Sequence, residues 1–191
     1  MTELKHQQSE IAVTLSMYQA SVPAFGRVLA QLDAMLDKAQ NHAAARKIDP
    51  AALLTARLYP DMFTCLKQVQ IVTDFCKGAS SRLAGREVPS WSDDEKTFGD
   101  LKARIARTRA LMETFRPVDI DGSETRDITL KLSGASVKLK GQPYLVQFVL
   151  PNLYFHAATA YGILRHNGVE IGKMDFIGPV GSRSEGESAT P

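Results

Sequence analysis

His156 is the histidine whose position best suits chemistry inside a folded chain. At 100° per residue it falls within the apolar stripe of Leu153, Ala160 and Ile163, so we expect its imidazole to point into the core. A buried imidazole needs hydrogen-bond partners, and once held by them it can act as a general base or a metal ligand. A satisfied core histidine without a chemical role would occupy the same position. The sequence leaves both interpretations open.

Other polar side chains are expected around this imidazole. Asn152 and Thr159 lie within about 60° of His156 on the same helical wheel. Asp61 and Gln68 are seven residues apart and so share one face of another expected helix. Across a bundle these groups could form a polar pocket, with His156 and Asp61 as its candidate catalytic residues. The alternative for Asp61, which follows a proline, is that it caps the start of a helix.

Other residues with chemically useful side chains were also considered for a role in the site. Tyr161 is expected to border the same pocket. The remaining histidines, His6, His42 and His166, lie near chain or helix ends, which leaves His156 as the one plausible histidine ligand for a metal. Asp93, Asp94 and Glu95 are interpreted as the charged start of a helix, and the basic residues that follow as a solvated face. That face comprises Lys102, Arg104, Arg107 and Arg109.

Apolar spacings of three and four predict the helices that must position these groups. They are expected at residues 11–43 with a kink or restart at Pro23, at 51–58, 60–83 and 92–115, and at 143–167 with a kink at Pro151. Leu32 and Ile105 stand at the centres of two stripes. Alternation around Ser133-Gly134-Ala135 predicts a β-hairpin before the last long helix. The sequence thus predicts a mainly α, up-down four-helix bundle with a small hairpin.

Length and composition set limits on the class of protein. The chain has 191 residues, a length that suits one domain. Its net charge of +2 is too small to indicate a nucleic-acid or membrane partner. We expect a flexible start at 1–10, the bundle at 11–178 and a disordered tail at 179–191. Cys65 and Cys76 are about 16 Å apart along one expected helix, too far to form a disulfide. We expect both to be buried, free thiols, which is typical of a protein in the reducing cytoplasm.

Several separated blocks resemble a bacterial domain-of-unknown-function family, numbered one-nine-nine-three, of the DinB/YfiT-like superfamily. The resemblance implies a four-helix bundle that is often a homodimer. Better-known members of the superfamily hold a divalent metal, zinc or nickel, with three histidines, and some are thiol transferases. The blocks that carry the resemblance are residues 16–23, 56–62, 68–70, 151–156, Tyr161, 164–168 and Gly172-Lys173.

The three-histidine signature of that superfamily is incomplete here. It has one histidine on the second helix and two, four residues apart, on the last. His156 matches one of the last pair, but Ala160 stands four residues on, and no histidine lies in 60–83. We therefore favour a non-catalytic or weakly metal-binding module that interacts with a small molecule or a protein. The alternative is a metal-dependent, thiol-transferase-like enzyme with His156 as ligand or general base.

Overall fold

The protein is seen in a computed structural model, which describes residues 14–132 and 134–180. The expected flexible segment at 1–10 and the expected disordered tail from 181 onwards fall outside these residues. At the near end of that tail, the carbonyl of Pro179 accepts a hydrogen bond from the guanidinium of Arg27 at 2.6 Å. Within the described ranges no helix is both long enough and apolar enough to cross a bilayer.

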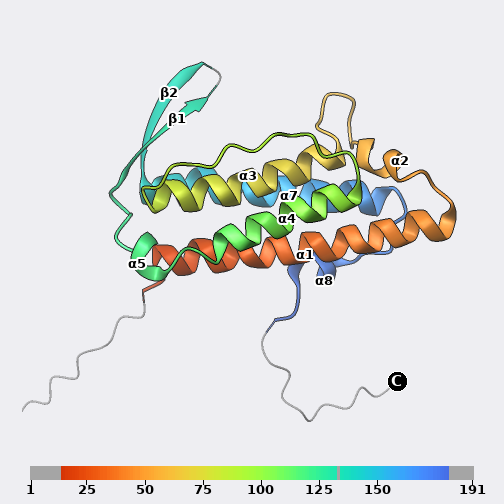
Figure 1. Ribbon diagram of the computed structural model, residues 1–191, viewed down its shortest axis with the longest axis horizontal. Coiled ribbons are helices and arrows are strands. Elements are labelled where there is room, and N and C mark those ends of the chain that lie inside the picture. The colour runs from red at the N-terminus through yellow and green to blue at the C-terminus, as the bar shows by residue number, and fades with distance from the viewer. Residues whose placement is uncertain (1–13, 133, 181–191) are drawn as a thin grey trace, which may run out of the picture.

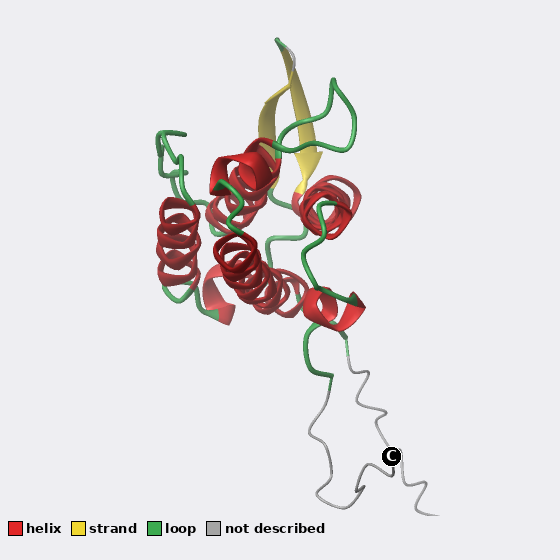
Figure 2. Cartoon of the chain, turned by 90° about the vertical axis from the view of Figure 1, so that its right-hand side faces the viewer, coloured by secondary structure: helices red, strands yellow, loops and turns green. Residues whose placement is uncertain are grey.

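Four long helices form a bundle, and a two-stranded hairpin stands beside one end of it (Figure 1). The long helices are α1 (Met17–Arg46), α3 (Cys65–Leu83), α4 (Phe98–Met112) and α7 (Leu150–His166). Shorter elements are α2 (Pro50–Thr55), α5 (Pro117–Ile120), α6 (Gly141–Pro143), the π-helix η1 (Tyr144–Val149) and α8 (Lys173–Ile177). Figure 2 views the bundle nearly end on, with the hairpin projecting from it. The expected mainly helical bundle with a hairpin before the last long helix is confirmed.

The helices do not alternate strictly in direction. Arg104 bonds to Thr73, and Met112 accepts from Ser80, so residue numbers rise together along α3 and α4 and these two helices are parallel. Between them, residues 84–97 return along the length of the bundle as an extended strap (Figure 1). By contrast, α7 runs antiparallel to α3, since His156 meets Gln68 while Tyr144 meets Arg82.

Helix α1 begins later than predicted and is not interrupted. Ser16 caps it in a capping box with Gln19, and Leu15 outside the helix is 74% exposed. The helix continues through Pro23, so the restart expected there, with Ser21 as the new N-cap, is wrong. Ser21 is instead buried and donates to the carbonyl of Met17 at 2.6 Å. A proline near the start of a long helix removes one backbone hydrogen bond, which the rest of the stripe outweighs.

Helices α3 and α4 also begin later than the sequence suggested. Thr64 caps α3, so Pro60 and Asp61 lie in the preceding turn. Thr97 caps α4 in a capping box with Asp100. The interpretation of Asp93, Asp94 and Glu95 as a helix start is therefore wrong, because these residues belong to the strap.

The hairpin and the last helix are joined through a stretch of unusual helix. Strands β1 (Asp127–Leu132) and β2 (Ala135–Lys140) pair antiparallel from Asp127↔Lys140 to Leu132↔Ala135. After them, η1 takes the wider π form just before Pro151. Because Pro151 has no amide hydrogen, the α-helical bond to the carbonyl of Gln147 cannot form there. The expected irregularity at Pro151 is thus a π-helix on its N-terminal side.

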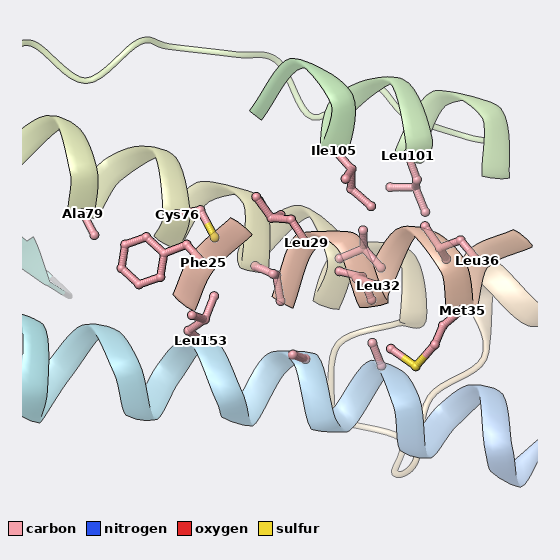
Figure 3. Packing of buried hydrophobic residues seen from close by; sticks show 14 of the residues in the cluster. Phe25, Leu29, Leu32, Met35, Leu36, Cys76, Ala79, Leu101, Ile105 and Leu153 are labelled. Carbon is pink, nitrogen blue, oxygen red and sulfur yellow. The ribbon is translucent and has the colours of Figure 1, made fainter. Parts of the chain in front are cut away.

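The core lies where the four long helices meet. Phe25, Leu29, Leu32 and Leu36 of α1 are fully buried and face the other three helices (Figure 3). Cys65 and Cys76 are buried, free thiols of α3. Burial raises the pKa of Cys65 to about 12 and raises that of Cys76 further, so both stay protonated and act as small apolar groups.

Candidate functional site

His156 and Gln68 meet between α7 and α3. The Nδ1 atom of His156 lies 2.6 Å from Oε1 of Gln68, and Gln68 is 1% exposed. The amide nitrogen of Gln68 donates to the carbonyl of Phe63 at 3.3 Å, which turns its oxygen towards the imidazole. Since an amide oxygen can only accept, Nδ1 carries the proton. Two of the predicted site residues are therefore in direct contact.

This contact fixes the state of the imidazole. With Nδ1 protonated, Nε2 of the neutral ring is an acceptor, and it makes no hydrogen bond to any residue that the structure describes. Burial lowers the pKa of His156 below its ordinary value, so the ring is neutral at pH 7. The group can accept a hydrogen bond or take up a proton at Nε2.

Aromatic rings hold the imidazole on two sides. Phe75 of α3 stacks on it with ring centroids 6.0 Å apart, and Phe155 meets it edge-on at 5.2 Å. Phe155 is itself 57% exposed. His156 is half-buried, so the ring stands at the rim of an aromatic cluster and not deep in the core.

The other predicted pocket residues make no hydrogen bond to His156 among the described residues. Asn152 donates to the carbonyl of Phe148, and Thr159 donates to the carbonyl of Phe155, each at 2.7 Å. Tyr161 packs edge-on against Phe176 of α8 with centroids 5.9 Å apart. Asp61 is exposed in the turn before α3, and the expectation that it would cap that helix is wrong, because Thr64 is the cap. In the part of the chain that the structure describes, no hydrogen bond or ion pair joins Asp61 to His156.

A three-histidine metal centre of the kind that the resemblance implies does not fit these residues. Within the described ranges, no three His, Cys, Asp or Glu side chains are grouped closely enough to hold a metal ion. The group opposite His156 is the Gln68 amide, whose oxygen already accepts the Nδ1 hydrogen. The two thiols that could supply sulfur ligands are buried and protonated.

A second polar cluster was missed by the sequence analysis. Arg104 of α4 has a side chain only 2% exposed, and it reaches the strap as well as α3. Its guanidinium contacts Asp93 at 3.0 Å, Glu95 at 2.9 Å and Asp74 at 2.8 Å. It also donates to Thr73 and to the carbonyl of Ser92.

This Arg104 cluster also contains the single tryptophan of the sequence. Lys77 and Arg107 lie over the ring of Trp91, at 4.6 and 4.3 Å from its centroid. A hollow of about 450 Å³ opens beside Trp91, Glu95 and Arg104. The contacts of Arg104 with Asp93 and Glu95 tie the strap to α4, and its contact with Asp74 ties α4 to α3. The sequence feature that could have indicated this cluster is the tryptophan followed by three acidic residues, 93–95, in a segment with no helical period.

The fold and this site define a DinB-type helical bundle. A solved DinB family member protein from Shewanella denitrificans is 38% identical and superposes with a TM-score of 0.82, covering 87% of this chain and 94% of that one. The chain belongs to the family described as Domain of unknown function (DUF1993), whose profile matches residues 17–177. No curated protein matches the sequence.

Proposed function

We propose that this chain is a non-catalytic binding module that works as a homodimer in the cytoplasm. The observation that carries the proposal is an uncharged outer surface on η1 and α7. From Gly141 to Leu164 the sequence contains no Asp, Glu, Lys or Arg. A helix on the outside of a water-soluble bundle normally carries charges on its solvent side, so their absence indicates a covered surface.

Large apolar side chains occupy this surface and the loop beside it. Leu58 lies within 3.6 Å of the position that a Cβ of Gly162 would take, so the loop before α3 adjoins α7. We call the set the α7 face; its exposed fractions are Leu58 46%, Tyr59 65%, Phe63 54%, Val146 52%, Tyr154 44% and Phe155 57%. Together these side chains expose on the order of 500 Å² of mostly apolar area.

A second copy of the chain is the occupant that suits this face. With the small residues Ala158 and Gly162 included, the face offers on the order of 600 Å², which is smaller than the ~800 Å² per partner of a standard interface and suits a weaker dimer. A two-fold axis near Ala158 would place Tyr154 of each copy over the small Gly162 of the other. The η1 and α7 part of the face has no charged residue, so two copies meeting there would not repel each other. Arg57 and Asp61, which are exposed in the adjoining loop, have opposite charges.

Phe155→Glu tests this interface. We expect the wild-type protein to be a dimer at micromolar concentration, and the variant to raise the dimer dissociation constant by at least about 100-fold, because it buries a charge in an apolar contact. Sedimentation equilibrium measures this directly. Val118→Glu, at a residue that is 75% exposed on α5, is the matched control and should leave the dimer intact. A monomeric wild type, or equal effects of both substitutions, would refute the interface.

The role of His156 is tested by metal analysis. Under this proposal, protein purified without a histidine tag contains no stoichiometric zinc or nickel, because His156 has a glutamine amide and aromatic rings beside it in place of further ligands. A tag is avoided since it could supply the missing imidazoles. Stoichiometric metal that is lost in His156→Ala would favour the metal-dependent, thiol-transferase-like alternative, with His156 as ligand.

A further inference from the structure

A separate hollow lies where α3, the hairpin and η1 meet. Its volume is about 230 Å³, which is below the range of drug-sized pockets and suits a smaller molecule. The residues that line it include Asp74, Phe75, Arg82, Leu130, Tyr144 and Phe148. Phe75 is shared with the surroundings of His156, but His156 itself does not line this hollow.

Arg82 brings a positive charge to this hollow that the described residues do not balance. Its guanidinium donates to the hydroxyl of Tyr144 at 3.3 Å and forms no ion pair with a carboxylate in those ranges. The carboxylate of Asp74 is already held at 2.8 Å by Lys77 and at 2.8 Å by Arg104. Lys131 adds a second cation at the rim. The net charge facing the hollow is therefore positive.

Gly78 provides the space in which the guanidinium lies. A Cβ at this position would come within 2.5 Å of Nη1 of Arg82. Arg82 is one turn further along α3, so the missing side chain lets the guanidinium fold back along the helix. The position of the charge thus depends on this glycine.

Aromatic and aliphatic groups form the opposite wall. The ring of Phe148 lies 5.7 Å from that of Phe75 and 6.1 Å from that of Tyr144, and Leu130 of β1 is only 6% exposed. Tyr144 and Phe148 both belong to η1, and π-helices are rare and concentrate at functional sites. Burial raises the pKa of Tyr144, so its phenol keeps its hydrogen. That hydrogen has no acceptor among the described residues.

We propose that this hollow binds a small organic monocarboxylate with an aromatic or branched aliphatic body. The forked guanidinium of Arg82 would take the carboxylate in two parallel hydrogen bonds, and the phenol of Tyr144 would donate a third. The body of the ligand would pack on Phe75 and Phe148. The site goes beyond the proposed dimer, because it lies on the hairpin side of α3 and none of its residues belongs to the α7 face.

Phenylacetate and its neutral isostere phenylacetamide are the probes that test this site. Titration followed by amide chemical shifts should give saturable binding of phenylacetate in the millimolar range or tighter, with the largest shifts at residues of η1 and of α3 around Phe75. Phenylacetamide has the same shape without the charge and should bind at least about 10-fold more weakly. Equal binding of the two, or no saturable shift with phenylacetate, would overturn the proposal.

Two variants assign the binding to Arg82. Arg82→Gln should weaken phenylacetate binding by at least about 10-fold. Gly78→Ala keeps the arginine but displaces its guanidinium, and it should weaken binding similarly while favouring the helix, since alanine has the higher helix propensity. Arg109→Gln, at an exposed arginine of α4, is the matched control and should bind like the wild type. Wild-type affinity in both test variants would disprove the assignment.

Discussion

Replacing Arg104 by methionine is expected to lower the free energy of unfolding by about 3–5 kcal/mol, the range observed when one partner of a buried ion pair is removed. The guanidinium is 2% exposed and meets three carboxylates, those of Asp74, Asp93 and Glu95, at 2.8 to 3.0 Å. Methionine has a similar length and stays apolar, so the loss reports the missing charge and hydrogen bonds more than a cavity. Urea denaturation followed by circular dichroism measures it.

The size of this effect follows from what the substitution leaves behind. Glu95 is 10% exposed at its side chain and would keep only the amide of Gln70, which donates to its other oxygen at 2.7 Å. A carboxylate left in that position is shielded from water and has no opposite charge in contact with it to offset the lost solvation. Because residues 84–97 are held to α3 and α4 through this cluster, the strap should loosen as well, and amide exchange in it should rise.

Arg107→Met is the matched control on the same helix. Arg107 lies over Trp91 at 4.3 Å but is exposed, so its replacement should cost no more than about 1 kcal/mol. If Arg104→Met were no more destabilising than Arg107→Met, the cluster would not hold the strap.

Acid should reduce the difference between Arg104→Met and the wild type. The hydrogen bond from Lys67, with the nearby charge of Arg104, lowers the pKa of Asp93. A carboxyl whose folded pKa is below its unfolded value stabilises the protein above about pH 4 and loses that contribution as the pH falls through the folded value. Once the pH falls below the lowered pKa of Asp93, the wild type should therefore approach the variant in stability.

The helices could be predicted because they depend on local spacing, whereas the Arg104 cluster could not. Arg104 falls on the same helix as the exposed Arg107 and Arg109, and the sequence alone marks all of them as basic. What buries Arg104 is the parallel arrangement of α3 and α4, with the strap returning between them. That arrangement depends on long-range packing, which residue spacing does not encode.

The candidate site, too, could be predicted only in part from local spacing. The helical period placed His156 and Gln68 towards each other, and they are 2.6 Å apart. It also placed Asn152 and Thr159 beside His156, yet each side chain bonds to the backbone carbonyl four residues before it. Short polar side chains in helices often bond to the carbonyl four residues back, and a helical wheel does not register this competition.

Leu32→Ala and Ile105→Ala are each expected to lower the free energy of unfolding by about 2–4 kcal/mol, through lost burial and the cavity left behind. Leu32 is 0% exposed and Ile105 is 1% exposed, and they belong to one cluster between α1 and α4 (Figure 3). Four helices converge on this cluster, so neighbouring side chains have little freedom to close the cavity.

Chemical denaturation measures both variants, with Leu15→Ala, at a 74% exposed residue, as the control. A loss below about 0.5 kcal/mol for either core variant would mean that its helix faces the core differently, because a truly buried leucine or isoleucine cannot be truncated at so small a cost.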